Sequence, residues 1–444
     1  MGLNSAWYQS NPALYYLRNS LRGLGMRVRI REFALSEQPM DILATLIGLK
    51  PDVICFSAYV WNRGLIQLLI PELRKLLPKA KIVLGGPEAD SPSLQESPDF
   101  VLRGPGEGIF RLLAESGFSL PRGIHEAPAP HLQDLPFPYR ASDKPALQNK
   151  LIYYETSRGC PFRCVYCLSA LDTRNEARFD PALSADRKRL FAELDRLVAL
   201  EPRTLKFVDR SFNAHPGLAR LIWKYALERG QSCEFHFEIY PGLLAEEDIR
   251  LLEKAPPGRI RFEIGIQTTN PEVATNCGRA SDWPKARNIL LALRQRTQVR
   301  VHADLLAGLP GENISSIFNS LDELAALFPH EIQLGLLKIL PHTPMRDIAS
   351  QRGYLWMDDP PYQVLASDAL SFAEISELHD LARAINLYWN KAEFIGHWED
   401  LLKSGKPASE LFIRLRSHHY ANSLPLHSIS RQARAEIFAK TLLI

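Results

Sequence analysis

The 444-residue sequence lacks the features of several protein classes. No run reaches 18 consecutive apolar residues, and the first residues show no basic segment followed by an apolar one, which argues against a membrane span and a secretory signal. The net charge is only +3, from 53 basic and 50 acidic residues, so bulk charge does not favour nucleic acid or an anionic membrane as partner. These absences predict a cytoplasmic protein with neither partner.

Cysteine is also scarce. The chain has six, three of them scattered, so a disulfide framework is not expected. The other three, Cys160, Cys164 and Cys167, fall within eight residues, and in a reducing compartment such a cluster is first interpreted as a metal site. The apolar fraction of 46% and the charged fraction of 23% are typical of a folded protein, and the length suggests two or three domains.

Residues 1–120 alternate between strand-like and helix-like segments. Continuous apolar runs indicate parallel strands buried on both faces, and apolar residues at helical spacing lie between them. The expected segments are helices at 11–24 and 65–77 and strands at 28–33, 52–58, 81–84 and 99–103. The alternation predicts a doubly wound, Rossmann-like α/β domain. Residues 1–4 are too few for a full first strand, so we expect either a missing first strand or a misassigned start codon.

Two regions of different character flank the centre of the chain. Residues 121–150 contain six prolines and no sustained apolar period, which predicts a semi-rigid, extended linker. Residues 351–444 are mostly helical, with a long helix expected at 367–386. We expect this C-terminal domain to cover one end of the preceding domain.

Residues 151–350 repeat a strand and a helix six times, which predicts an open, partial (β/α)6 barrel. The strands are expected at 151–157, 204–209, 234–240, 259–267, 299–306 and 332–340, and the helices near 186–200, 216–229, 245–254, 284–295 and 315–328. Apolar and polar residues alternate within the strands, so each strand has two distinct faces. The apolar face must pack under the helices, and the polar face should line the barrel interior. Buried carboxylates and imidazoles there need partners or ligands.

The cysteines Cys160, Cys164 and Cys167 follow the first barrel strand directly, at C-x3-C-x2-C spacing. Three thiolates in one loop can hold three corners of a cubane iron–sulfur cluster and leave the fourth iron open. A structural zinc site would require a fourth Cys or His nearby, and none follows within twenty residues. The spacing, with Tyr166 before the last cysteine, resembles the signature of the radical S-adenosylmethionine (SAM) superfamily.

The resemblance continues along residues 150–345. Residues 207–213 (FVDRSFN), 262–267 (FEIGIQ), 304–312 (DLLAGLPGE) and 337–344 (LKILPHTP) are similar to the motifs at the ends of the second, fourth, fifth and sixth strands of that superfamily. The resemblance implies a [4Fe–4S] cluster whose open iron chelates SAM, and a 5′-deoxyadenosyl radical that abstracts hydrogen from an unactivated carbon. It also implies SAM-binding residues, namely Tyr166, Asp209, Glu238, Glu263, Gln267, Asp304 and Leu340. Arg158 and Arg163 either tune the cluster or are solvated loop residues.

Three loops follow strands of the N-terminal domain at their carboxyl ends, where doubly wound folds bind their ligands. They are a Ser-containing loop at residues 57–59, a Gly-Gly loop at 85–88 and a Gly-x-Gly-Glu loop at 103–108. Their order, ahead of a radical SAM core, resembles the cobalamin-binding domain of B12-dependent radical SAM enzymes over about residues 4–115. The resemblance implies cobalamin-binding residues, namely Ser57, Ala58, Tyr59, Trp61, Gly85, Gly86, Pro87, Glu88, Gly104 and Glu107. We expect the small residues Ser57, Gly85 and Gly86 to leave room for the nucleotide tail of cobalamin.

One departure concerns the axial ligand of cobalt. Cobalamin-dependent mutases carry an Asp-x-His-x-x-Gly loop after the first strand, whereas residues 4–12 contain no histidine and the first histidine is His125. We therefore expect base-off cobalamin without a histidine below the metal, with Trp7, Tyr59, Trp61 or Asn62 near its face. A degenerate domain that has lost cobalamin is the alternative.

Three functions follow from these patterns. The first is a cobalamin-dependent radical SAM methyltransferase. The second is a non-methylating radical SAM enzyme that cyclises or rearranges a carbon skeleton, and the third is a degenerate, non-catalytic homologue. The expected partners are a small-molecule or peptide substrate and an electron donor such as flavodoxin or ferredoxin. The C-terminal region resembles an extension of a poorly characterised group of these proteins, most clearly at residues 386–391 (NLYWNK), and this carries no chemistry.

Overall fold

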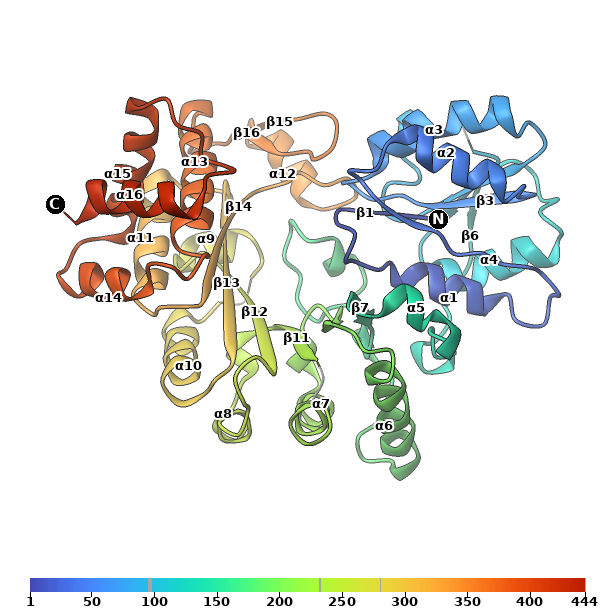
Figure 1. The fold of residues 1–444 in the computed structure, drawn as a ribbon, viewed down its shortest axis with the longest axis horizontal. Coiled ribbons are helices and arrows are strands. Elements are labelled where there is room, and N and C mark those ends of the chain that lie inside the picture. Colours follow the sequence, from blue (N-terminus) through green and yellow to red (C-terminus); the bar gives the residue numbers. More distant parts are fainter. Residues whose placement is uncertain (95–97, 231–232, 280, 444) are drawn as a thin grey trace. The chain divides into compact units, whose positions relative to one another are not determined.

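The computed structural model describes residues 1–94, 98–230, 233–279 and 281–443 (Figure 1). The chain divides into two compact units. The first contains Met1–Glu155 and Glu176–Lys206, and the second contains Thr156–Asn175 and Phe207–Ile444. Within the described residues, none of the helices combines the length and the apolar content needed to cross a bilayer.

The first unit begins with a doubly wound domain. Its elements are β1 (Gly2–Asn4), α1 (Pro12–Ser20), β2 (Glu32–Ala34), α2 (Pro39–Gly48), β3 (Val53–Ser57), α3 (Arg63–Leu76), β4 (Lys81–Gly85), β5 (Phe100–Arg103), α4 (Gly106–Glu115) and β6 (Gly123–Glu126). Strands β3, β4, β5 and β6 form a parallel sheet in that order, and β1 pairs in parallel with β2. The alternation of strands and helices in the sequence therefore predicted the architecture correctly.

Apolar side chains cover both faces of this parallel sheet. In β4, Ile82 and Leu84 belong to a core cluster with residues of α2 and α3, while Val83 belongs to a second cluster with residues of α4. A strand buried on both faces must be apolar along its whole length, which explains the continuous runs in the sequence. The carboxyl ends of β3, β4 and β5 thus come together at one edge of a rigid sheet.

Two expectations for this unit need correction. Strand β2 is limited to Glu32–Ala34, and residues 28–31 belong to neither a strand nor a helix. The proline-rich residues 121–150 are also not a simple extended linker. Their β6 pairs with β5, and α5 (Lys144–Leu147) and two 3₁₀ turns (Leu132–Asp134 and Ala141–Asp143) follow it.

The remaining elements of the first unit are β7 (Leu151–Tyr154), β9 (Glu176–Ala177), α6 (Ser184–Val198) and β10 (Thr204–Phe207), whose last residue belongs to the second unit. The second unit contains β8 (Ser157–Arg158), α7 (Pro216–Glu228), β11 (Glu234–Ile239), α8 (Glu246–Leu252), β12 (Ile260–Gln267), α9 (Pro271–Asn276), α10 (Trp283–Arg296), β13 (Arg300–Ala307), α11 (Ile314–Ala325) and β14 (Glu331–Leu336). The six-stranded sheet has the order β14-β13-β12-β11-β10-β7. This is the open, partial barrel that six strand–helix repeats predict.

The parallel strands β11 to β14 separate apolar from polar side chains. Phe235, Phe237 and Phe262 are completely buried on one face, where Trp223 of α7 contacts Phe237 and Phe262. The register places Glu238 beside Glu263 on the opposite face. The inner face of these strands is therefore polar, as the alternation indicates.

The C-terminal region comprises α12 (Met345–Gln351), β15 (Leu355–Trp356), β16 (Val364–Ala366), α13 (Phe372–Tyr388), α14 (Ile395–Lys403), α15 (Ala408–Ala421) and α16 (Arg431–Leu442). Its α13 packs along the edge strand β14 and its α15 packs on α11, and the expected cover over a barrel end stays a prediction. The side chain of Asn390 accepts a hydrogen bond from the Ile332 amide and donates one to the Ile332 carbonyl, both at 2.9 Å. A side-chain amide thus pairs with the exposed edge of β14.

Candidate functional sites

The three cysteines occupy the loop after β8 in the second unit. Cys160 and Cys164 are buried and Cys167 is half-buried. The loop turns at Gly159, which has a φ of +88° and whose added Cβ would lie 2.6 Å from the carbonyl oxygen of Asp172. The same carbonyl accepts a 2.9 Å hydrogen bond from the Cys160 amide. Only glycine fits at this turn, so the local backbone fixes where the first cysteine lies.

A buried carboxylate supports the start of the cysteine loop. Asp209, which is 1% exposed, accepts hydrogen bonds from the Thr156 amide at 3.0 Å, the Thr156 hydroxyl at 2.7 Å and the Ser157 hydroxyl at 2.7 Å. Hydrogen bonds to a charged acceptor are roughly twice as strong as neutral ones. Because three donors already occupy this carboxylate, the geometry favours a positioning role for Asp209 over direct contact with SAM.

The segment Cys277-Gly278-Arg279 supports the loop from its other side, and sequence reasoning missed it. The Cys277 carbonyl accepts a 3.0 Å hydrogen bond from the Val165 amide, and an added Cβ on Gly278 would lie 2.9 Å from the Arg163 carbonyl. Arg279 Nη1 lies 3.7 Å from Cys164 Sγ. In the sequence, this segment could have been noticed only as a glycine followed by an arginine, with Arg279 twelve residues after the end of β12.

Arg279 is held in place by groups at the ends of two strands. Its Nη2 donates a hydrogen bond to the Gly265 carbonyl, and its guanidinium lies 5.4 Å from the centre of the Tyr240 ring. The Tyr240 ring also stacks on Phe162 of the cysteine loop, with ring centres 4.1 Å apart. A fixed positive charge beside a thiolate ligand suits both the negative cluster and an anionic group at its open iron.

The end of β12 has an irregular backbone. Gln267 has a φ of +71°, and the register between β12 and β13 shifts between Gly265 and Gln267. An added Cβ on Gly265 would lie 2.5 Å from Gln267 Nε2, so the Gln267 side chain lies directly over this glycine. Bulges and positive-φ residues of this kind re-aim side chains at functional sites.

Two other predicted SAM-binding residues lie close to the loop or at a strand exit. The Tyr166 hydroxyl is buried beside Cys164, and burial raises its pKa. Leu340 follows β14, is half-buried, and its carbonyl accepts a 2.8 Å hydrogen bond from the Thr343 hydroxyl.

The polar inner face carries ion pairs between neighbouring strands. His236 Nε2 lies 3.1 Å from a Glu263 oxygen, and Arg210 Nη1 lies 3.4 Å from Glu238. His302 lies 3.0 Å from Asp304 on its own strand and 3.0 Å from Glu331 on β14. Glu238, Glu263 and Asp304 thus share one face with two imidazoles.

The charges of this face shift its titration. Burial lowers the pKa of His302, but the ion pairs with Asp304 and Glu331 outweigh it and raise the value to about 9. Burial raises the pKa of Asp304, and the neighbouring Glu263 and Glu238 raise it further. At neutral pH the imidazole of His302 is therefore charged.

The donor set around the cysteine loop fits an iron–sulfur cluster. No three His, Cys, Asp or Glu side chains of the described residues converge on one point, so a single zinc ion finds no ready ligand set. A cubane instead needs one thiolate for each of three irons, and Cys160, Cys164 and Cys167 would be these ligands.

In the first unit, the predicted cobalamin site lies at the carboxyl edge of the sheet. Gly85 ends β4 and an added Cβ would meet nothing within 4 Å, whereas on Gly86, with a φ of +103°, it would lie 2.5 Å from the Ala58 carbonyl. A side chain at Gly86 would therefore overlap the neighbouring loop, although Gly86 itself is exposed, and the path of the nucleotide tail beside it stays a prediction. Gly85 and Gly104 face open space.

The other predicted residues of this edge differ in accessibility. Ser57, Ala58, Glu88 and Glu107 are buried, and Glu88 lies 3.5 Å from the buried Arg63. Glu88 is therefore engaged within the protein. Pro87 is exposed in the loop beside it.

Aromatic side chains lie exposed next to this edge. Tyr59 and Trp61 stack with ring centres 4.4 Å apart and planes 5° apart, and Trp61 is 52% exposed while Trp7 is 70% exposed. Asn62, by contrast, is completely buried and hydrogen-bonds the carbonyls of Leu3 and Ser57, so it cannot lie at the face of a cobalamin as expected. The exposed ring stack offers a flat apolar surface to a planar ligand.

Comparison with known families matches both of these regions of the chain. Residues 154–324 match the radical SAM superfamily, and residues 3–114 match the B12 binding domain. The chain therefore combines a region that matches the radical SAM superfamily with a region that matches the B12 binding domain. These families imply a [4Fe–4S] cluster, SAM and cobalamin as cofactors. Residues 350–442 match a protein family of unknown function, DUF4080.

Several individual proteins are similar to this chain. The cobalamin-dependent radical SAM methyltransferase TokK of Streptomyces tokunonensis is 24% identical over 333 residues, which cover 67% of this chain and 48% of TokK. The chain thus spans about half the length of this relative. The solved structure of the radical SAM methyltransferase TsrM from Kitasatospora setae, with tryptophan and a SAM analogue, has a TM-score of 0.62 at 17% identity and covers 81% of this chain and 79% of TsrM. The cobalamin-dependent radical enzyme OxsB has a TM-score of 0.64 at 13% identity and covers 98% of this chain and 72% of OxsB.

Proposed function

We propose that this protein is a cobalamin-dependent radical SAM methyltransferase that moves a methyl group to an unactivated carbon. When bound, the cluster and SAM supply a 5′-deoxyadenosyl radical that abstracts hydrogen, and cobalamin supplies the methyl group. The observation that carries the proposal is the presence of both sites in one chain, a three-cysteine loop next to Arg279 and an open sheet edge at Gly85. The protein itself orients these groups and excludes water.

At the cysteine loop, Cys160, Cys164 and Cys167 would hold the cluster. Arg279 would neutralise part of its negative charge and bind the carboxylate of SAM, while Asp209 keeps the loop in place through Thr156 and Ser157. The remaining SAM contacts would come from Tyr166, Glu238, Glu263, Gln267, Asp304 and Leu340.

At the sheet edge, Gly85 and Gly104 would let cobalamin approach the backbone. The Tyr59–Trp61 stack would cover part of the corrin, and Ser57, Ala58, Gly86, Pro87, Glu88 and Glu107 would shape the loops around it. No histidine precedes His125, so the cobalamin would be bound base-off.

The wider setting follows from the sequence. We propose four domains, namely residues 1–120, 121–150, 151–350 and 351–444, a cytoplasmic location, a small-molecule or peptide substrate and an external electron donor such as flavodoxin or ferredoxin.

The deciding experiment is anaerobic reconstitution with SAM carrying a labelled methyl group. Methyl transfer predicts that 5′-deoxyadenosine and S-adenosylhomocysteine form together and that the label enters the substrate. Production of 5′-deoxyadenosine alone would favour a cyclisation or rearrangement. This is the second candidate, because the similar protein OxsB is described as a radical enzyme and not as a methyltransferase. Absence of both products would favour a degenerate homologue.

A further inference from the structure

The turn that follows β13 connects the barrel strands with the C-terminal region. It comprises residues 308–312, Gly-Leu-Pro-Gly-Glu, and we call it the β13 turn. Its backbone is left-handed at both glycines, with a φ of +94° at Gly308 and +79° at Gly311. Because β13 ends at Ala307, the turn is joined directly to the strand that carries Asp304. Contacts that hold the turn therefore also hold the exit of this strand.

The β13 turn is bonded to the exit of the neighbouring strand β12. The Glu312 carboxylate is buried and accepts a 2.7 Å hydrogen bond from the Thr268 hydroxyl. Thr268 directly follows Gln267, one of the residues proposed to contact SAM. The position of the turn therefore influences where the Gln267 side chain lies.

The β13 turn is also linked to the cysteine loop. Asn276 Nδ2 donates a 3.3 Å hydrogen bond to the Pro310 carbonyl. The next residue, Cys277, accepts the hydrogen bond from the Val165 amide that supports the loop. A short path of two hydrogen bonds and one peptide bond thus leads from the turn to the loop.

Residues of the C-terminal region hold the turn as well. The Tyr354 hydroxyl donates a 3.2 Å hydrogen bond to the Gly308 carbonyl, and Asp368 Oδ1 accepts a 3.3 Å hydrogen bond from the Gly311 amide. An added Cβ on Gly308 would lie 3.0 Å from Val364 Cγ1, so β16 packs closely against the turn. These three residues belong to residues 350–442, which match the family of unknown function.

Burial and charge strengthen the two hydrogen bonds from this region. Tyr354 is buried, and burial together with the nearby Asp368 carboxylate raises the pKa of its phenol, so the donated proton stays in place. Asp368 also accepts a 2.6 Å hydrogen bond from Arg352 Nε, which fixes the carboxylate beside the turn. A charged acceptor held in this way bonds an amide more strongly than a neutral one.

We propose that Tyr354 and Asp368 are positioning residues for SAM. They hold the β13 turn, and the turn aligns Gln267 and supports the cysteine loop so that both can contact SAM. This assignment rests on the proposed function, because it takes the loop and Gln267 as parts of the SAM site. It gives residues 352–368 a part in cofactor binding.

Three substitutions and a matched control test the proposal. Tyr354→Phe removes one hydrogen bond, Asp368→Asn keeps an acceptor for the Gly311 amide but removes the charge, and Asp368→Ala removes both. The control is Asp322→Asn. Asp322 likewise accepts two hydrogen bonds, from the amide and the hydroxyl of Ser409 at 2.7 and 2.8 Å, but it joins α11 to α15 and not to the turn.

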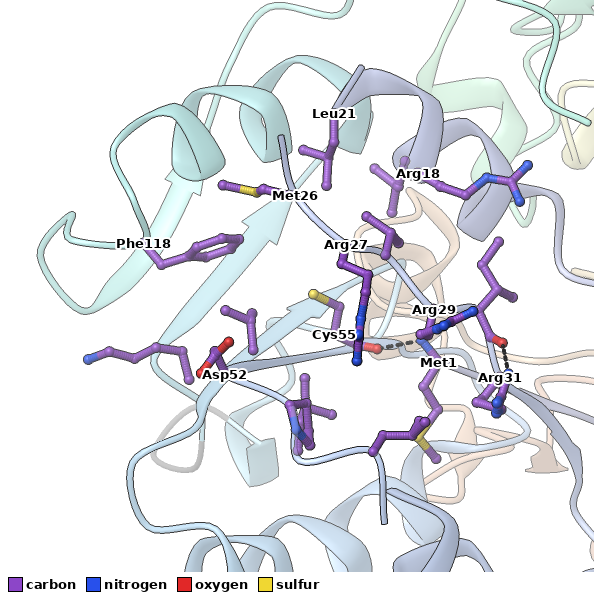
Figure 2. A pocket seen from close by; sticks show the side chains of 18 of the residues that line it. Met1, Arg18, Leu21, Met26, Arg27, Arg29, Arg31, Asp52, Cys55 and Phe118 are labelled. Atoms are coloured by element: carbon purple, nitrogen blue, oxygen red, sulfur yellow. Dashed lines mark hydrogen bonds between the residues drawn. The ribbon is translucent and has the colours of Figure 1, made fainter. Parts of the chain in front are cut away.

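The measurements separate the SAM site from the general fold. Hydrogen exchange of the Gly311 amide is measured on the apoprotein. The Kd of SAM, and KM and kcat for 5′-deoxyadenosine formation, are measured on the anaerobically reconstituted protein together with its iron content. Alkylation of Cys55, which lies at a pocket of about 730 Å³ beside β3, reports whether the first unit stays folded (Figure 2).

We expect Asp368→Ala to speed exchange at Gly311 by at least about tenfold. It should raise the Kd and KM of SAM by about 5–20-fold while kcat, iron content and Cys55 alkylation change by less than about twofold. Asp368→Asn and Tyr354→Phe should raise the Kd by about 2–5-fold, and Asp322→Asn should match the parent.

Two results would overturn the proposal alone. One is a parent-like Kd of SAM in Asp368→Ala and Tyr354→Phe, even with faster exchange at Gly311. The other is an equal loss of affinity in Asp322→Asn, which would show that general destabilisation is the cause. Failure of the parent itself to bind SAM would refute the proposed function, and this assignment with it.

Discussion

Gly85 and Gly86 are neighbours, but substitution should affect them in opposite ways. At Gly86 an alanine must adopt a φ of +103° with its Cβ 2.5 Å from the Ala58 carbonyl. The left-handed backbone costs about 1–2 kcal/mol and the overlap about 1–3 kcal/mol. For a unit of this size, a loss of about 2–5 kcal/mol lowers the melting temperature by roughly 5–20 °C.

At Gly85 the added side chain meets nothing within 4 Å, so Gly85→Val should change stability by no more than about 1 kcal/mol. If cobalamin binds there, the isopropyl group occupies its place, and a penalty of about 1–3 kcal/mol weakens binding by about 5–150-fold. Gly48→Val, which also enters open space but lies at the end of α2, is the matched control.

The assays are thermal unfolding of the apoprotein and absorbance titration with hydroxocobalamin. We expect Gly86→Ala to have a lowered melting temperature. Gly85→Val should keep the melting temperature of the parent and bind cobalamin weakly, and Gly48→Val should resemble the parent in both assays. A Gly85→Val protein that binds cobalamin as tightly as the parent would refute the placement of the ligand. Failure of the parent itself to bind would favour a degenerate domain.

Three further predictions concern the metal centres and the inner face. Replacement of Cys160, Cys164 and Cys167 together by alanine should abolish iron and sulfide content after reconstitution; retention of a full cluster would mean that other cysteines are the ligands. The Co(II) form should show no nitrogen superhyperfine splitting in its EPR spectrum, and splitting from an axial imidazole or benzimidazole would contradict base-off binding without histidine. The pKa of His302 is raised to about 9, above its unfolded value of about 6.5, so its stabilisation is complete below about pH 6.5 and is lost as pH rises through 9. His302→Gln should flatten that decline in unfolding free energy, and an unchanged pH profile would show that the imidazole is not charged.

Periodicity and order along the chain predicted most of the fold. The continuous apolar run at β3 reflects a strand buried on both faces, and the alternation in β12 reflects a strand with one apolar face. Both patterns can be recognised in the sequence alone. The cysteine spacing likewise indicates the cluster by itself, because the three expected ligands lie within eight residues of one another. Such local signals suffice where a short segment carries its own chemistry.

The rest depends on contacts between distant residues. Gly86 looks like Gly85 in the sequence, and only the approach of Ala58 distinguishes a packed glycine from an open one. Arg279 lies more than a hundred residues from Cys164, and no spacing rule connects them. Asp209 was predicted to contact SAM. Its three hydrogen-bond donors belong to Thr156 and Ser157, which lie far from it in the sequence, so its positioning role is visible only in the structure.

Asn390 connects the helical C-terminal region to the edge strand β14 of the barrel. An open barrel has a free edge, and a free edge invites another chain to pair with it. The side chain of Asn390 forms the two hydrogen bonds with Ile332 that a backbone residue of a seventh strand would form. The neighbouring Trp389 donates a hydrogen bond to the carbonyl of Pro329, which precedes β14. The region at 350–442 is thus not a separable appendage. It pairs, at Ile332, with an edge that a complete barrel would cover with further strands.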